Sequence, residues 1–266
     1  MLTVTDYLAQ PAIAPDARIA YGHHPDQFGD LYLPAAAQPT PVIVLIHGGC
    51  WQAAYDLTPL GECCAALRAA GFAVWSLEYR RLGNGGGWPH TFLDVAAGVD
   101  HLRTLATDQR LDLTRVIAVG HSAGGHLALW LAMRPTLPVT SELYRANPLP
   151  LRGVVALAAV ADLAQGVVAT ACGAACAELI GHDLQRYSET SPRERLPLGI
   201  LHYHLVGSDD PIVPAAYVAA FVAAAQAAGD TTHLSILPQC GHFELTTPHS
   251  TAWSTVMRAV AEIASS

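Results

Sequence analysis

Short apolar runs, each ending in polar residues or glycine, recur along the chain. They are nearly continuous and rich in Val, Ile and Leu, which is typical of strands buried on both faces of a parallel sheet. The runs are PVIVLIHGG (41–49), FAVWSLEYR (72–80), RVIAVGHS (115–122), GVVALAAV (153–160), ILHYHLVGS (200–208) and THLSILP (232–238). Two earlier segments, ARIAYG (17–22) and FGDLYLP (28–34), predict a hairpin that adds antiparallel strands at the edge.

Segments of helical period separate these runs, at 59–70, 92–106, 124–134, 215–228 and 250–264. Because strand and helix alternate, we expect an α/β architecture with right-handed crossovers. Its central sheet would be mostly parallel, with about eight strands, and helices would cover both faces. At 266 residues the chain has the length of a single α/β domain, which we assign to 1–266.

One long interval, 162–197, shows no strand pattern. Its sequence predicts one or two short helices and a loop. Segments of this length between regular elements of a compact domain are usually lids or binding segments. We therefore expect 162–197 to form a small cap-like insertion over the functional site.

Composition limits the partners of the chain. About half of the residues (52%) are apolar, 14% are charged and the formal net charge is -8. A compact globular protein is indicated, and nucleic acid is not expected as a partner, because phosphate binding requires a basic patch. We expect a small-molecule substrate, and we leave a homodimer as one option for the assembly.

No targeting or membrane segment is visible. The N-terminal stretch MLTVTDYLAQPAIAPD has neither the basic nor the continuous apolar region of a secretory signal. No apolar run approaches the ~20 residues that cross a bilayer. We therefore expect a cytoplasmic protein without a membrane partner.

The cysteines show no metal or redox motif. They are Cys50, Cys63, Cys64, Cys172, Cys176 and Cys240, and no two form a C-x-x-C pair. In a reducing compartment we expect most of them to be small buried hydrophobic residues. The four-residue spacing of Cys172 and Cys176 would allow them to share one helical face.

The segment GHSAG, residues 120–124, carries the chemistry. It matches G-x-S-x-G, follows the apolar run VIAV and opens the helical segment GGHLALWLAM. A strand, sharp turn and helix in this order is the setting of a nucleophile elbow, in which Ser122 is held above the sheet. The alternative is that Ser122 only caps the helix.

A serine hydroxyl needs a general base and a carboxylate that orients it. In this arrangement both follow the serine, each after a later strand. The segment GSDDPIVP offers Asp210, with Asp209 as runner-up, and GHFEL offers His242. The alternative is that Asp210 serves only the turn before Pro211, since Asp is common in turns.

Other histidines compete weakly with His242. His202 and His204 lie within a predicted strand, where core or pocket positions are expected, and His249 follows farther along the chain. Their H-x-H spacing lacks a suitable third ligand, so we expect no metal. His126, one turn after the elbow, is expected to pack beneath it.

The segment LIHGGCW, residues 45–51, ends a strand at the same edge of the sheet. Glycines there let backbone N–H groups approach a developing oxyanion. The N–H groups of Gly49 and Cys50 are the candidate donors, with Gly48 lining the hole and Ala123 contributing a second donor. His47 is expected to hold the shape of this loop.

Together these segments resemble the α/β-hydrolase esterases, the group of hormone-sensitive-lipase-like enzymes and kynurenine formamidases. The matching segments are HGGCW, EYRR, WPHTFLDV, GHSAGGHLAL, GSDDPIVP and GHFEL. The resemblance implies an α/β-hydrolase fold with Ser122 as nucleophile, Asp210 as acid and His242 as base.

The loop departs from the lipase-like pattern H-G-G-G at Cys50 and Trp51. It is more similar to the H-G-G-Y-W-Q of kynurenine formamidases and the H-G-G-x-W of bacterial feruloyl and acetylxylan esterases. The large N-terminal helical cap of the lipase-like group is also missing, which favours a compact esterase or formamidase.

These features predict a serine hydrolase of small carboxylic esters or N-formyl aryl amides that needs no cofactor. We expect Trp51, Trp88 and residues of 162–197 to line the acyl pocket. Two alternatives stay open: a small-peptide or acyl-peptide hydrolase of the prolyl oligopeptidase type, and a catalytically silent binding protein of the same fold.

Overall fold

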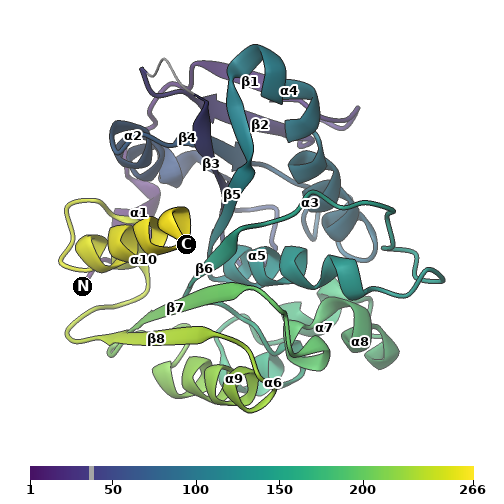
Figure 1. Ribbon diagram of the computed structural model, residues 1–266. Helices are drawn as coiled ribbons and strands as arrows, with labels where there is room; N and C mark the ends of the chain where they lie inside the picture. Colours follow the sequence, from purple (N-terminus) through teal and green to yellow (C-terminus); the bar gives the residue numbers. More distant parts are fainter. Residues whose placement is uncertain (36–38) are drawn as a thin grey trace.

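A computed structural model describes residues 1–35 and 39–266 and contains one eight-stranded sheet (Figure 1). Its strands are β1 (Ala17–Ala20), β2 (Phe28–Tyr32), β3 (Thr40–Ile46), β4 (Ala73–Leu77), β5 (Leu111–His121), β6 (Gly153–Leu157), β7 (Leu201–Gly207) and β8 (Thr232–Leu237). They are ordered β1-β2-β4-β3-β5-β6-β7-β8. β2 is antiparallel to both neighbours, whereas β3 to β8 run parallel, so the mostly parallel sheet and its antiparallel edge are confirmed.

Helices pack on both faces of this sheet. They are α1 (Val4–Leu8), α2 (Gly61–Ala69), α3 (His90–Asp100), α4 (Leu102–Gln109), α5 (Ala123–Met133), α6 (Leu163–Ala169), α7 (Ala175–Leu179), α8 (Tyr187–Thr190), α9 (Ala215–Ala227) and α10 (Trp253–Ser265). In Figure 1, α2 and α10 lie on one side of the sheet, with α3 and α5 on the other. This is the α/β-hydrolase fold.

The central strands explain why the functional segments meet. β3 lies between β4 and β5, and its residues from Val42 to Ile46 are fully buried because apolar side chains point to both faces. Parallel strands end at one edge of the sheet, so the loops after β3, β5, β7 and β8 emerge side by side. The predicted catalytic and oxyanion residues all follow one of these four strands, whereas Trp88 follows β4 and 162–197 follows β6.

Three boundaries differ from the sequence predictions. The segment 92–106 forms two helices, α3 and α4, because the backbone bends at His101, where the N–H of Thr104 bonds to the His101 carbonyl three residues back. The last helix begins at Trp253 rather than 250. The short helix α1 was not predicted.

The segment 162–197 forms α6, α7 and α8 with short 3₁₀ turns between them. It covers α5: His126 Nε2 donates to the Thr190 carbonyl at 2.8 Å, and Trp130 Nε1 donates to the Glu189 carbonyl at 2.9 Å. Every residue of α5 is buried, since the sheet lies on one side of this helix and 162–197 on the other.

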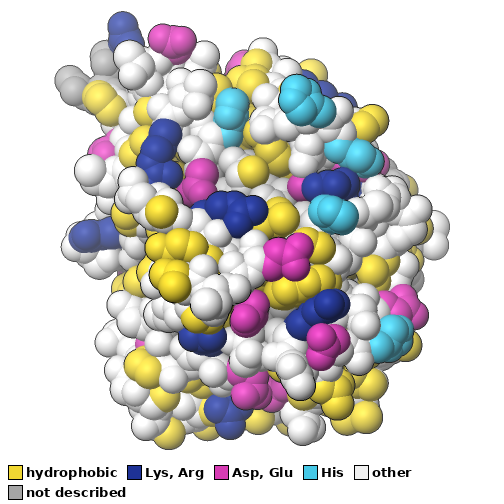
Figure 2. Space-filling view, turned by 90° about the vertical axis from the view of Figure 1, so that its right-hand side faces the viewer, with side chains coloured by type: hydrophobic (Ala, Val, Ile, Leu, Met, Phe, Trp, Pro, Cys, Tyr) yellow, Lys and Arg dark blue, Asp and Glu magenta, His cyan; other side chains and the backbone are white. Residues whose placement is uncertain are grey.

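The surface on the side of α7 and α8 mixes charges of both signs. Figure 2 shows Arg side chains interspersed with Asp, Glu and hydrophobic side chains on this face. Arg186 pairs with Asp183, and Arg193 approaches Asp162. Among the helices formed by residues 1–35 and 39–266, none has both the length and the apolarity needed to cross a bilayer.

Candidate active site

Ser122 occupies the sharp turn between β5 and α5. Its φ of 55° and ψ of -119° are unusual for a residue with a side chain, and they match the strained turn expected of a nucleophile elbow. Gly124 allows the close approach of α5 to β3, because a Cβ there would overlap the carbonyl oxygen of Ile46. The sequence pattern therefore corresponds to a real backbone constraint at this turn.

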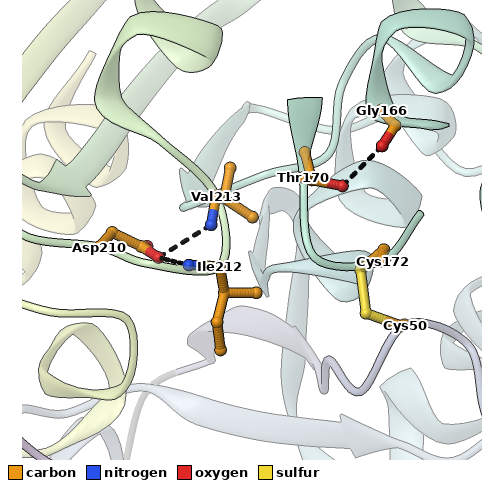
Figure 3. Close-up of a disulfide and its surroundings, with 7 residues drawn as sticks. All are labelled: Cys50, Gly166, Thr170, Cys172, Asp210, Ile212 and Val213. Atoms are coloured by element: carbon orange, nitrogen blue, oxygen red, sulfur yellow. Dashed lines mark hydrogen bonds between the residues drawn. A yellow bond between two sulfur atoms is a disulfide. The ribbon is translucent and has the colours of Figure 1, made fainter. Parts of the chain in front are cut away.

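His242 and Asp210 meet across two neighbouring loops. His242 Nδ1 donates to Asp210 Oδ2 at 2.7 Å, and both side chains are buried. The other carboxylate oxygen, Oδ1, accepts the backbone N–H groups of Ile212 and Val213, each at 2.8 Å (Figure 3). With Nδ1 engaged, Nε2 is the ring nitrogen of His242 that is left for a proton transfer.

Several effects act on the Asp210 carboxyl. Burial alone would raise its pKa, but the hydrogen bond and charge of His242, with the N–H groups of Val213 and Ile212, outweigh burial and lower the pKa. Asp210 is therefore a carboxylate at neutral pH, as an orienting acid must be.

A second histidine, His121, contacts both the backbone and the ring of His242. Its Nε2 donates to the His242 carbonyl at 2.9 Å, and the two rings lie with their centroids 4.4 Å apart. Burial, together with the nearby His242, lowers the pKa of His121 to about 3. His121 thus stays neutral and fixes the backbone of His242 without competing for its proton.

The loop after β3 presents free N–H groups beside Ser122. Gly49, Cys50 and Trp51 all have positive φ, at 101°, 47° and 56°. Within residues 1–35 and 39–266, the N–H groups of Gly49, Cys50 and Ala123 have no protein acceptor. Gly48, Gly49, Cys50 and Ser122 border one cavity, so this loop and the nucleophile turn enclose the same space.

His47 holds the loop from below. Its Nδ1 contacts the Gly48 carbonyl at 2.8 Å, and its Nε2 contacts Glu78 Oε1 at 3.0 Å. The hydroxyl of Tyr79 donates to the His47 carbonyl at 2.9 Å and its ring stacks on the imidazole. The expectation that His47 shapes the loop agrees with these contacts.

The cavity is mainly apolar, and several of its walls were not predicted. Besides Ser122, His121, His242 and the glycine loop, it is lined by Val4, Tyr7, Leu8, Tyr55, Asp56, Pro59, Ile212 and Phe243. The first three belong to α1. A sequence signal for α1 existed: Thr3 and Asp6 form a capping box that starts the helix.

Neither tryptophan predicted for the pocket borders this cavity. Trp51 is 0% exposed and packs edge-on against His126 in the core. Trp88 lies under the guanidinium of Arg186, 4.8 Å from its ring centroid. The side chain of Trp51 is therefore part of the core and not a wall of the cavity that Gly48, Gly49 and Cys50 border. His126 does pack beneath the elbow, as expected.

Residues of 162–197 were also expected to line the pocket, but none of them borders this cavity. The segment packs on α5, whereas α1 borders the cavity. The description of 162–197 as a cap-like insertion stays a prediction. His202 and His204 are buried on β7, where Nδ1 of the first and Nε2 of the second are 2.8 Å apart. They are core histidines, as predicted.

Cys50 and Cys172 form a disulfide, which was not predicted (Figure 3). The two residues are 122 positions apart, so no spacing in the sequence could indicate the pair. Cys172 precedes α7, whereas Cys176 lies in it, so the two do not share a helical face.

The remaining cysteines, Cys63, Cys64, Cys176 and Cys240, are free and buried, as expected. Disulfides are rare in the cytoplasm. The cytoplasmic location stays a prediction that the Cys50–Cys172 disulfide does not favour.

The comparison that decides the family covers most of the chain. The BD-FAE family model matches residues 29–220. This chain belongs to the BD-FAE family. The matched residues include the loop after β3, Ser122 and Asp210. The match ends before His242, which lies in the loop after β8 of this BD-FAE chain.

A curated relative of this BD-FAE protein is named as an esterase. Esterase LipC of Mycobacterium tuberculosis is 28% identical over 113 residues, which span 42% of this chain and 28% of the esterase. The chain therefore matches less than a third of that relative's length.

Solved structures with the same fold match almost the whole BD-FAE chain. Esterase B of Lactobacillus rhamnosis, in a structure with a tributyrin phosphonate, has a TM-score of 0.83 and 20% identity over 98% of this chain and 90% of its own. A truncated carbohydrate esterase from gut microbiota has a TM-score of 0.79 and 20% identity over 97% and 99% of the two chains.

These likenesses confirm the fold. The resemblance to α/β-hydrolase esterases is thus confirmed, while the likeness to kynurenine formamidases stays a prediction.

Proposed function

We propose that this protein is a serine hydrolase of small carboxylic esters. The observation that carries the proposal is the Asp210–His242 hydrogen bond at 2.7 Å, made by two buried side chains beside the cavity that Ser122 borders. An orienting carboxylate, a base and a nucleophile then share one site with free backbone N–H groups. That combination is what acyl transfer requires.

The reaction follows from these positions. Ser122 Oγ attacks the ester carbonyl carbon while its proton passes to His242 Nε2, and the N–H groups of Gly49 or Cys50 and of Ala123 stabilise the oxyanion. Collapse of the tetrahedral species expels the alcohol, which takes the proton from His242. Water then repeats the sequence on the acyl-enzyme and releases the acid.

The relatives support the class of reaction. Esterase LipC, esterase B and the carbohydrate esterase all carry the word esterase in their names. The match spans only 28% of the length of LipC, so we propose esterase activity for this chain and do not transfer it from the relative.

The walls of the cavity indicate the substrate. Val4, Leu8, Pro59 and Ile212 make them apolar, which suits a short acyl chain or an uncharged alcohol. Three aromatic side chains, Tyr7, Tyr55 and Phe243, also border the space, and this observation favours N-formyl aryl amides as a second candidate class.

Replacement of the nucleophile tests the proposal. We expect Ser122→Ala to lower the hydrolysis of p-nitrophenyl acetate and butyrate by a factor on the order of 10⁴ or more, because no other hydroxyl replaces Oγ. The wild-type chain should react with a fluorophosphonate probe and the variant should not. N-formylkynurenine, assayed in parallel, distinguishes the two substrate classes.

Ser208→Ala is the matched control, since Ser208 is an exposed serine after β7 whose hydroxyl donates to Asp209 and accepts the Gln239 N–H, away from the cavity. Ser208→Ala should keep wild-type activity. Ester turnover retained by Ser122→Ala, or a wild-type chain inert to the probe, would refute the serine mechanism.

A further inference from the structure

One short segment, residues 170–172, touches two separate loops of the active site. Its Cys172 is bonded to Cys50 in the oxyanion loop, and its Ala171 N–H donates to the Ile212 carbonyl at 2.8 Å. Figure 3 shows this segment between the Asp210–Val213 turn and Cys50. The segment therefore connects the oxyanion loop to the loop of the acid.

On the oxyanion side, the disulfide acts at a strained position. Cys50 follows Gly49, has a φ of 47°, and its N–H is one of the candidate donors. A residue with a side chain holds this conformation only where its surroundings enforce it. The residues on either side of Cys50 are held by backbone hydrogen bonds: the Gly49 carbonyl accepts the Gln52 N–H, and the Trp51 carbonyl accepts the Leu82 N–H. The side chain of Cys50 is held by the disulfide.

On the acid side, the same segment meets the turn that binds Asp210. The Ile212 N–H donates to Asp210 Oδ1, while the Ile212 carbonyl accepts from Ala171. Thr170 is fixed in turn, because its hydroxyl donates to the Gly166 carbonyl at 2.8 Å at the end of α6. The anchor of the disulfide is therefore a rigid part of the fold.

We propose that the Cys50–Cys172 disulfide is a positioning device that holds the oxyanion-binding N–H groups of the loop after β3, so that its reduction lowers turnover while the fold persists. The inference rests on the proposed esterase function. Oxyanion donors act through their fixed placement, since a donor that must reorganise during the reaction contributes less. Cys172 thus serves catalysis from outside the cavity.

Opening the disulfide requires a reductant that supplies two electrons. A dithiol such as dithiothreitol attacks one sulfur, forms a mixed disulfide and then closes on itself. The products are the thiols of Cys50 and Cys172 and one cyclic disulfide, so two electrons pass from the dithiol to the protein. Cys50 borders the cavity, which gives a small dithiol a route to the bond.

The test compares Cys172→Ala with wild-type protein, with and without dithiothreitol. Loss of one oxyanion donor costs about 10² to 10³ in kcat, so a donor that is loosened rather than removed should cost roughly tenfold. We expect kcat to fall by that factor and KM to change less. Activities are expressed per site titrated with fluorophosphonate, well below the melting temperature.

A second readout separates positioning from stability. Inhibition by a trifluoromethyl ketone, whose adduct carries the oxyanion, should weaken by a similar factor. Cys176→Ala is the matched control, because it removes a free cysteine of the same region and keeps the disulfide. It should show wild-type kcat and the wild-type response to dithiothreitol.

The outcomes are distinct. Wild-type kcat and ketone affinity in Cys172→Ala or in the reduced wild-type chain would overturn the positioning role, even if thermal stability fell. If Cys172→Ala does not fold, the reduced wild-type chain decides, with thiol alkylation and mass measurement proving that the bond is open. A wild-type chain without esterase activity or probe labelling would refute the proposed function, and this inference with it.

Discussion

At the scale of single residues, two adjacent carboxylates lie in opposite environments. Asp210 is buried, binds His242 and accepts two backbone N–H groups, whereas Asp209 is exposed and accepts the hydroxyl of Ser208. The difference follows from the turn after β7, which directs consecutive side chains to opposite sides. Only Asp210 can hold the imidazole in one tautomer.

This contrast makes a paired experiment possible. Asp210→Asn should lower kcat for p-nitrophenyl acetate by a factor on the order of 10⁴, because an amide cannot stabilise the imidazolium and favours the wrong tautomer. Steady-state kinetics at pH 7.5 measure the effect. Asp209→Asn should stay within about twofold of wild type, and equal losses in both variants would contradict the assignment.

The sequence predicted these residues to different degrees. Ser122 and His242 followed from their place after predicted strands, and the D-x-x-V-P pattern favoured Asp210 over Asp209, in agreement with the hydrogen bond of Asp210 to His242. The order of residues does not contain the direction of a side chain, which is why Trp51 was misplaced: it packs against His126 and does not border the cavity. The Cys50–Cys172 pair depends on tertiary contacts alone.

At the scale of elements, α1 is the wall of the site that comes from the far end of the chain. It spans only Val4–Leu8, too short to be stable as an isolated helix. Tyr7 holds it in place: its ring stacks on Phe243 with centroids 4.7 Å apart, and the side chain is 8% exposed. The Gln10 amide also donates to the Thr247 hydroxyl at 2.9 Å.

Removal of this ring should change substrate choice. Tyr7→Ala opens one wall beside Ser122, so we expect the ratio of kcat/KM for p-nitrophenyl octanoate over acetate to rise roughly tenfold, in line with about 1–3 kcal/mol per apolar group in a pocket. A series of acyl chain lengths measures it. Tyr144→Ala, on a loop outside the cavity, should leave the ratio unchanged, and an unchanged ratio in Tyr7→Ala would contradict the role of α1.

Strands were predicted far better than this helix. Buried parallel strands produce continuous apolar runs that are visible without tertiary information. A five-residue helix cannot show a 3.6-residue period. The prediction that 162–197 lines the pocket failed for a different reason. A long interval without strands has the same sequence pattern whether it packs on α5 or lines a cavity.

At the scale of the whole molecule, the fold keeps several histidines neutral. Burial lowers the pKa of His121 to about 3 and of His126 to about 4, and it also lowers the pKa of His202 and His204. In the unfolded chain these rings titrate near the ordinary value of 6.5. Below that pH the unfolded state binds protons that the folded state does not, so stability falls as the pH falls.

The sign and slope of this effect can be measured. As the pH falls from 6.5 to 5, the loss of unfolding free energy for each histidine that stays neutral in the fold should approach about 1.4 kcal/mol per pH unit, because the unfolded ring becomes fully protonated. Urea denaturation followed by tryptophan fluorescence gives the slope. His126→Gln should reduce the slope, because it removes one ring that burial keeps neutral; a flat profile in the wild-type chain would contradict the expectation.

The cavity joins residues 4–8 to residues 242–243, which lie far apart in the sequence. A fragment that contains α1, the loop after β3 and Ser122 but stops before β8 lacks both His242 and Phe243, the ring on which Tyr7 stacks. Such a fragment has no base beside Ser122 and no closed cavity. We therefore expect it to be inactive in ester hydrolysis, however much of the sheet it forms.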